Sequence, residues 1–243
     1  MAEPVIIVEN VTKRFVINHA HTLKDAIISV VKRKKVTTAF TALNDLSLTI
    51  NEGESVALLG FNGSGKSTTL KLLSGVIRPD SGQVLTRGRV AGLIEVGAGF
   101  HPDLTGRQNV YLNGAILGMT KKEIDARFDD IVAFSEIEEF LDTEVRYYSS
   151  GMFMRLAFAV AIHAEFDILL IDEILSVGDE PFQAKCMDRI AQIQEQGKTL
   201  VIVSHNLDQM AELCDRGIFL RRGEVVFDGP ADAAVAAMRE STR

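Results

Sequence analysis

The sequence is poor in cysteine and has no surplus of positive charge. Its 243 residues include two cysteines, Cys186 and Cys214, which form no CxxC or Cys/His spacing. A disulfide framework or a zinc site is therefore not expected, and this cysteine usage fits a reducing cytosol. The chain has 26 Lys and Arg against 33 Asp and Glu, a net charge of −7. Because proteins that bind nucleic acid over a broad surface are usually basic, we expect no nucleic-acid partner.

The sequence also lacks an apolar run of the roughly 20 residues that a membrane-spanning helix needs. Its longest apolar stretches are cut short: residues 157–162 are followed by His163 and Glu165, and residues 168–171 by Asp172. The N-terminus has no basic start with an apolar stretch behind it, as a signal peptide would. If the protein serves a membrane process, we expect another chain to supply the membrane-spanning part.

Predicted strands and helices alternate along the chain, with no internal repeat and no low-complexity linker. Strands are expected at residues 5–8, 42–50, 54–59, 167–171 and 199–203, and a hairpin at 218–227. Helices are expected at residues 66–74, 120–140, 155–164, 181–196 and 231–240. This alternation is typical of an α/β fold with a largely parallel sheet. Residues 19–35 also have apolar side chains at helical spacing and end in a basic cluster.

The strongest motif follows the strand predicted at residues 54–59. It is the run Gly60-Phe61-Asn62-Gly63-Ser64-Gly65-Lys66-Ser67-Thr68, which fits the P-loop pattern GxxxxGK[ST]. In a P-loop, backbone N–H groups and the start of the following helix surround phosphate oxygens. The lysine, here Lys66, reaches the β- and γ-phosphates, and the Ser67 hydroxyl binds Mg²⁺. The motif therefore predicts a nucleotide phosphate chain and Mg²⁺ as ligands.

A second motif, residues 168–173, has four apolar residues followed by Asp172 and Glu173. Asp172 is thereby placed at the carboxyl end of a buried strand, where ligands bind in open α/β sheets. We expect Asp172 to hold Mg²⁺ and Glu173 to orient the attacking water.

A third motif, residues 148–152, places Ser149, Ser150 and Gly151 at the start of an apolar helix. Such a helix start can be a second anion site, but on this segment alone a simple serine N-cap is the favoured interpretation, because capping serines are common.

In their order and spacing, these motifs resemble the ATP-binding subunit of an ABC transporter over residues 5–230. Residues 148–152 stand at the place of the LSGGQ signature, and residues 172–179 resemble a Walker B motif running into a D-loop. Residues 203–205 resemble the switch histidine after its strand. The resemblance implies an α/β P-loop NTPase fold. It implies an ABC-type nucleotide-binding domain with a mixed β-sheet and a helical subdomain at residues 100–160.

The resemblance also implies a catalytic site shared by two chains. Two subunits would close head to tail, so that Ser149 and Gly151 of one chain contact the γ-phosphate of the ATP that Lys66 of the other chain holds. His205 would contact the same phosphate, and Asp179 would lie across the dimer interface. ATP and Mg²⁺ are the implied cofactors, and Lys66, Glu173 and His205 the implied catalytic residues.

For two roles that the family has, the sequence offers two candidate residues each. The usual Q-loop glutamine is missing, and its place falls at Glu95 or Val96. We favour Glu95, because a carboxylate could still reach Mg²⁺ or its water. Phe15 stands where an aromatic residue stacks on adenine, with Phe40 as the rival; packing in the core is the alternative for both rings.

The signature has Ser150 and Met152 where the family usually has glycine and glutamine. With the runs 97–107 and 174–179, this signature resembles the branch that exports lipid-linked polysaccharides: O antigens, galactan and, more distantly, capsule and teichoic acid. The basic amphipathic segment inserted at residues 17–40 fits that branch. This segment would lie either near the membrane surface or packed on its own domain.

The resemblance therefore implies an ATPase that powers export of a lipid-linked polysaccharide through a separate transmembrane permease, at the cytoplasmic face of the bacterial cytoplasmic membrane. Residues 1–243 would form one nucleotide-binding domain, ending in a short helix at 231–243 and without a carbohydrate-binding domain. The alternatives are a soluble ABC-type ATPase acting on nucleic acid or ribosomes, and a nucleotide-binding regulator. A P-loop kinase would leave residues 149–151 and His205 without roles.

Overall fold

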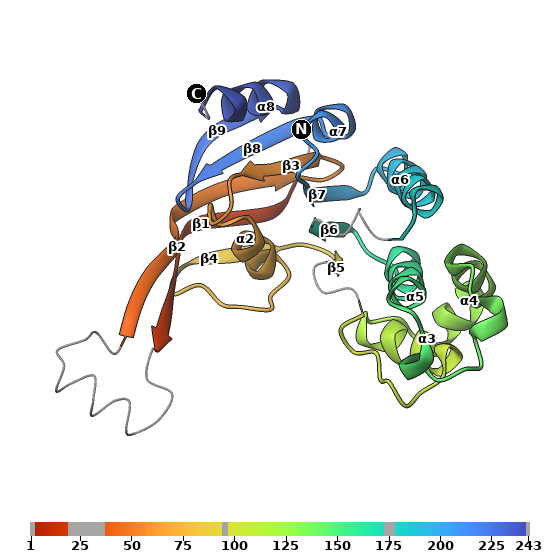
Figure 1. Ribbon diagram of the computed structural model, residues 1–243. Coiled ribbons are helices and arrows are strands. Elements are labelled where there is room, and N and C mark those ends of the chain that lie inside the picture. The colour runs from red at the N-terminus through yellow and green to blue at the C-terminus, as the bar shows by residue number, and fades with distance from the viewer. Residues whose placement is uncertain (1–2, 19–36, 94–96, 173–177, 242–243) are drawn as a thin grey trace.

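The computed structural model describes residues 3–18, 37–93, 97–172 and 178–241, and it contains two β-sheets (Figure 1). The larger sheet has the strand order β5 (Val90–Leu93), β6 (Ile168–Asp172), β7 (Thr199–Val203), β3 (Ser55–Gly60), β8 (Arg216–Arg221) and β9 (Glu224–Pro230). Its neighbouring strands are parallel except for the β8–β9 hairpin. The smaller sheet is antiparallel, in the order β2 (Thr37–Asn51), β1 (Pro4–Asn18) and β4 (Ser81–Thr86). The predicted α/β fold with a mixed sheet is confirmed.

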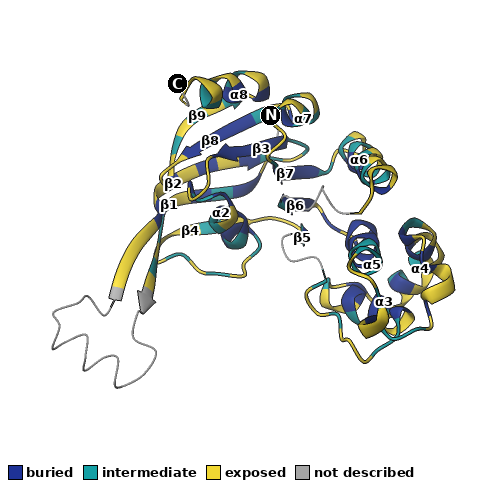
Figure 2. Cartoon of the chain, in the orientation of Figure 1, coloured by how far each residue is buried: buried dark blue, intermediate teal, exposed yellow. Residues whose placement is uncertain are grey.

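The central strand β3 is buried along its whole length because both faces of the larger sheet are covered (Figure 2). Side chains alternate between the faces of a strand. Val56 and Leu58 point into a core shared with the smaller sheet and with α2 (Lys66–Leu73). Ala57 and Leu59 point into a second core. That core is completed by α5 (Ser150–His163), α6 (Glu180–Glu195), α7 (Leu207–Leu213) and α8 (Ala231–Glu240).

A third core lies within a group of helices at one side of the sheet (Figure 1). It packs α3 (Gly106–Ile116) and α4 (Lys121–Ser135) against α5 through apolar side chains such as Val110, Ile131 and Val160. Both α3 and α4 begin with a capping box, and the one predicted at Thr120 and Glu123 is confirmed. The described part of the chain contains no helix with both the length and the apolar composition of a membrane span.

The bounds of two predicted helices differ by several residues in the structure. The helix predicted at residues 120–140 ends at Ser135, because Glu136 adopts a left-handed conformation with φ of 57°. A separate 3-10 turn, Glu138–Phe140, follows. The helix predicted from residue 155 already begins at Ser150, so the signature residues form its first turn. The sequence pattern did not indicate β4, β5, α3 or α7; β4, for example, is mostly exposed and contains Gly82, so it lacks an apolar alternation.

The first two strands continue beyond the smaller sheet as a paired ribbon. Each has 15 residues, and their pairing runs to Asn18 opposite Thr37. Residues 19–36 lie outside the described residues, so the predicted basic amphipathic segment stays a prediction.

Candidate functional site

The candidate site lies where the strands of the larger sheet end. In the register of the sheet, Ala57 of β3 pairs with Ile202 of β7, and Asp172 of β6 pairs with Val203 of β7. Because these strands are parallel, the segments that follow them emerge at the same edge. The P-loop after β3, Asp172 at the end of β6 and His205 after β7 are therefore brought to one edge, as the motifs predict.

Backbone conformations that only glycine readily adopts shape the P-loop. Gly65 has φ of 111°, and a Cβ added there would come within 2.6 Å of Leu43 Cδ2 and 2.9 Å of the Ala42 carbonyl oxygen. A Cβ at Gly60 would lie 2.3 Å from Ser64 Oγ and 2.6 Å from the Leu220 carbonyl oxygen. The loop therefore has no room for side chains at these two positions, and its path is fixed by sterics.

Hydrogen bonds tie the same loop to two other elements. The Ser64 N–H donates to the Phe61 carbonyl at 3.0 Å, which closes the turn. The Gly223 N–H donates to the Ser64 carbonyl at 2.9 Å, and the Asn44 N–H donates to the Gly223 carbonyl at 3.0 Å. The β8–β9 turn is thus hydrogen-bonded to the loop, and β2 is hydrogen-bonded to that turn.

The polar groups of the loop are arranged for an anion. Lys66 is only 7% exposed, and its Nζ donates to the Gly60 carbonyl at 2.7 Å and to the Phe61 carbonyl at 3.3 Å. The Ser64 hydroxyl is buried and has no hydrogen-bond partner among the described residues. Helix α2 begins at Lys66, and its N-cap residue, Gly65, makes no side-chain cap. The backbone N–H groups of the first turn, which includes Ser67 and Thr68, therefore receive no N-cap side chain. A phosphate chain would complete this arrangement.

The structure describes Asp172 and His205 at this edge, but only part of the motifs around them. Asp172 ends β6 with one carboxylate oxygen buried. Its neighbour Glu173 and the Q-loop candidates Glu95 and Val96 lie outside the described residues, so their predicted roles are not tested. His205 is exposed in the turn between β7 and α7, and Asn206 caps α7 by accepting from the Gln209 N–H at 3.2 Å.

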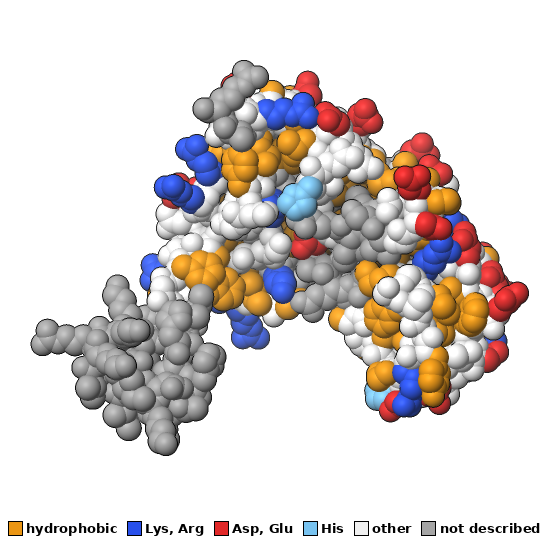
Figure 3. Space-filling view, in the orientation of Figure 1, with side chains coloured by type: hydrophobic (Ala, Val, Ile, Leu, Met, Phe, Trp, Pro, Cys, Tyr) orange, Lys and Arg blue, Asp and Glu red, His pale blue; other side chains and the backbone are white. Residues whose placement is uncertain are grey.

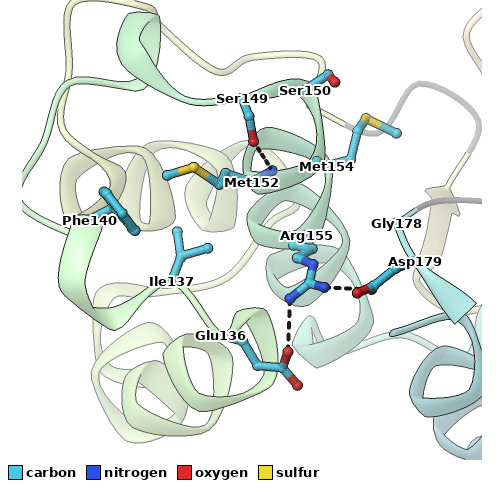
Figure 4. A pocket seen from close by; sticks show the side chains of 11 residues that line it. Glu136, Ile137, Phe140, Ser149, Ser150, Met152, Met154, Arg155, Gly178 and Asp179 are labelled. Carbon is cyan, nitrogen blue, oxygen red and sulfur yellow. Dashed lines mark hydrogen bonds and ion pairs between the residues drawn. The ribbon is translucent and has the colours of Figure 1, made fainter. Parts of the chain in front are cut away.

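The signature residues line a separate cavity of about 560 Å³ (Figure 4). Ser149 is the N-cap of α5 and accepts a hydrogen bond from the Met152 N–H at 3.1 Å. One wall is formed by Ser149, Ser150 and Gly151, and another part of the lining by Gly178 and Asp179. None of the described residues that line this cavity belongs to the P-loop. Within one chain, the P-loop and the signature turn therefore form two distinct sites.

Arg155 connects the elements around this cavity, although no sequence motif assigns it a role. Its guanidinium donates to Glu136 at 2.8 Å and to Asp179 at 2.5 Å (Figure 4). Burial raises the pKa of the Asp179 carboxyl, but the hydrogen bond and the charge of Arg155, together with nearby backbone N–H groups, outweigh it and leave that pKa below its usual value. The hydrogen bond from Lys185 lowers the pKa of Glu136, and the charge of Arg155 adds to this effect. Both carboxylates are therefore charged at neutral pH.

The two candidates for the adenine site lie together. Phe15 and Phe40 are cross-strand neighbours of β1 and β2, and their rings stack with centroids 5.5 Å apart. Phe40 is 48% exposed, and Lys13 Nζ lies 5.6 Å from the centre of the Phe15 ring. Both rings thus form one aromatic surface, and the structure does not distinguish which of them would stack on adenine.

A glycine-locked P-loop at the carboxyl edge of a largely parallel sheet, with an aspartate at the end of a neighbouring strand, defines a P-loop NTPase. The sequence profile of the ABC transporter family matches residues 43–176, more than half of the chain. The chain belongs to the ABC transporter family, as an ATP-hydrolysing cassette.

Individual relatives cover nearly the whole chain. It is 47% identical over 235 residues to the ABC transporter protein AbcA of Aeromonas salmonicida, a match that covers 97% of this chain and 76% of that protein. It is 42% identical over 247 residues to the O-antigen export system ATP-binding protein RfbB of Klebsiella pneumoniae, which covers 98% of this chain and 99% of that protein. A solved dimeric ATP-binding cassette in a post-hydrolysis state, bound to ADP and phosphate, has the same fold. Its TM-score is 0.73 at 24% identity, covering 93% of this chain and 98% of that one.

Proposed function

We propose that the chain hydrolyses ATP at a site shared by two copies and thereby powers export of a lipid-linked polysaccharide through a separate transmembrane permease. One observation carries the two-copy site: the signature cavity and the P-loop are distinct within one chain. A site that needs both motifs on one phosphate is then completed by a second copy, packed head to tail. The solved cassette with this fold is itself a dimer bound to ADP and phosphate.

The P-loop is the part of the site that would hold the phosphates of ATP. The orphaned Ser64 hydroxyl, the uncapped start of α2 and the steric limits at Gly60 and Gly65 all fit a bound phosphate chain. In our proposal, Asn62, Gly63 and the rest of the loop offer backbone N–H groups, and Lys66 turns its ammonium from the loop carbonyls to the phosphates. The stacked pair of Phe15 and Phe40 offers a surface for adenine.

The residues at the sheet edge fit Mg²⁺ better than a metal that needs a protein cage. Among the described residues, no group of three or more His, Cys, Asp or Glu side chains is placed so that it could hold a metal ion. Mg²⁺ is commonly bound by one or two protein oxygens together with phosphate oxygens and water. Ser67 and Asp172 would hold it, and Glu95 is the further candidate; the ion would neutralise phosphate charge.

The remaining catalytic roles belong to groups around the γ-phosphate. Glu173 would orient the attacking water or take its proton, and His205 would contact the γ-phosphate from the turn after β7. Ser149, Ser150 and Gly151 of the partner would approach the same phosphate with the N-terminal end of α5. Asp179 would lie across the interface. Catalysis of this kind works by positioning and charge stabilisation.

The cargo and the membrane partner are proposed from the relatives. RfbB of Klebsiella pneumoniae, which this chain matches over nearly its whole length, is the ATP-binding protein of an O-antigen export system. A chain in that role works on the cytoplasmic face of the bacterial membrane, held there by its permease. On the face shown in Figure 3, acidic side chains gather over α6, α7 and the outer side of α4, while Lys and Arg side chains are scattered. The distribution on this face, together with the net charge of −7, does not favour the rival function on nucleic acid or ribosomes.

Co-purification from native membranes tests the proposal. Tagged protein at its natural expression level is captured from detergent-solubilised membranes, and its partners are identified by mass spectrometry. A stoichiometric multi-span membrane protein is expected, and lipid-linked polysaccharide extracted from the same membranes should raise the ATPase rate of the complex. Capture of ribosomal proteins in place of a membrane protein would contradict the exporter function and leave the ATPase assignment in place.

A further inference from the structure

Arg155 spans the floor of the signature cavity and contacts both helices that flank it. Its Nη1 donates to Glu136, the C-cap residue of α4, and its Nη2 donates to Asp179, which occupies the N-cap position of α6. The guanidinium also lies over the Phe182 ring, 4.9 Å from its centre. Three elements that are distant in the sequence, α4, α5 and α6, therefore converge on one side chain of the signature helix.

The position of these contacts relative to the cavity is informative. Figure 4 shows Ser149 and Ser150 at the head of α5 on one side and Gly178 with Asp179 on the other, with Arg155 reaching from α5 to Asp179. Asp179 is well exposed, with 59% of its side chain accessible, whereas the Arg155 side chain is only 20% accessible. A half-buried guanidinium that is bonded to two carboxylates is held in one orientation. Its hydrogen bond therefore restrains the orientation of the more exposed Asp179 side chain.

We propose that Arg155 is a positioning residue that sets the spacing between the signature turn, residues 149–151, and Asp179. The two groups are then presented to the nucleotide-bearing face of the partner copy as one preformed surface. This inference rests on the proposed two-copy site and goes beyond it, because Arg155 itself touches neither the P-loop nor the phosphate. Its effect is on closure of the dimer and not on binding of ATP to a single chain.

Lys185 of α6 provides a matched control within the same cluster. Its Nζ lies 2.9 Å from Glu136, the same carboxylate that Arg155 binds, and 4.9 Å from the centre of the Phe134 ring. It also donates to the Ala133 and Phe134 carbonyls. Arg155 and Lys185 thus share a carboxylate and have the same kind of aromatic contact, but of these two only Arg155 is bonded to Asp179. A purely structural role predicts similar consequences for the loss of either cation.

The test compares R155Q with K185Q in the full-length chain, with E173Q in both to slow hydrolysis. ATP-driven dimerisation is followed by light scattering, and ATP affinity is measured with monomer at low concentration. We expect R155Q to weaken the dimer about tenfold, the size of one charged hydrogen bond, while K185Q leaves it unchanged. ATP affinity of the monomer should be the same in both. R155K, which keeps the charge but cannot bridge two carboxylates as a fork, should lie between them.

Amide hydrogen exchange adds a readout that does not depend on dimerisation. R155Q should accelerate exchange at residues 149–151 and 178–182, and K185Q should not. Equal dimerisation of R155Q and K185Q, with equal exchange in these segments, overturns the positioning role alone. If the parent E173Q chain forms no ATP-dependent dimer, the two-copy site of the proposed function fails, and the positioning role fails with it.

Discussion

The starts of α2 and α5, the two proposed phosphate-binding motifs, are built in opposite ways. At α2, the path of the loop is set by backbone: glycines in conformations closed to other residues, no room for a Cβ, and hydrogen bonds to the β8–β9 turn and β2. At α5, side chains make the contacts: Ser149 caps the helix, and Arg155 donates a hydrogen bond to Asp179 on the other side of the cavity. The first is locked by sterics, and the second by polar contacts of exposed and half-buried groups.

This difference fits the parts that the two motifs would play. A loop that holds the phosphates within one chain gains from rigidity, because its donors are then in place before ATP arrives. A surface that binds another chain and then releases it needs side-chain contacts that can break and form again. We therefore expect substitutions at α2 to affect ATP binding, and substitutions at α5 to affect the joining of two chains.

Glycine substitutions in the P-loop should give the largest effects. G65A forces a Cβ into the Ala42 carbonyl and Leu43 at a φ of 111°, so we expect ATP affinity to fall about 100-fold, as a backbone conflict of roughly 3 kcal/mol would produce. G63A is the matched control, since nothing lies within 4 Å of its added Cβ and only the φ of 77° is strained.

For G63A we expect a loss of about tenfold or less, from roughly 1 kcal/mol of backbone strain. Calorimetric titration with ATP measures both variants, with a thermal melt of each to report folding. Equal affinities for G65A and G63A would show that steric locking is not what fixes the loop.

Loss of the cap at α5 should give a smaller effect on stability and a selective effect on hydrolysis. S149A removes the hydrogen bond to the Met152 N–H, which costs about 1 kcal/mol of folding free energy for an N-cap serine. ATP affinity of the monomer should stay the same, while the hydrolysis rate falls because the partner's γ-phosphate loses a contact. Denaturant unfolding and steady-state kinetics separate the two effects. A lower ATP affinity in the monomer would place Ser149 in the same site as the P-loop.

The P-loop, the capping serine and the capping box at Thr120 were predictable from the sequence because each is local, with its partners within a few residues. The bounds of α4 were not, because its end depends on Glu136 taking a left-handed conformation that favours glycine. The pairing of Phe15 with Phe40 and the bridge from Arg155 to Asp179 join segments that only the tertiary fold brings together. An arginine in the second turn of an apolar helix was the one available signal for that bridge.

The smallest effect should be the pH dependence of the Arg155 bridge. The pKa values of Glu136 and Asp179 are lowered in the folded chain, so the stabilisation from their ion pairs is complete above their usual values of about 4 and is lost as the pH falls through the lowered values. The difference in melting temperature between the wild type and R155Q should be constant from pH 7 to about pH 5 and shrink below about pH 4. A difference that persists at pH 3 would assign the effect to packing of Arg155 on Phe182.

Mixing two inactive variants tests the central claim of a site shared by two chains most directly. K66A damages the P-loop, and G151D places a carboxylate at the signature turn, so neither chain alone can build a complete site. In a mixed head-to-tail dimer, one site combines both lesions, and the other combines the intact P-loop of G151D with the intact signature of K66A. We predict that mixing restores ATP hydrolysis to about a quarter of the wild-type rate, from one working site in half of the dimers. A mixture as inactive as its components, or a G151D chain that hydrolyses ATP at the wild-type rate, would contradict the account.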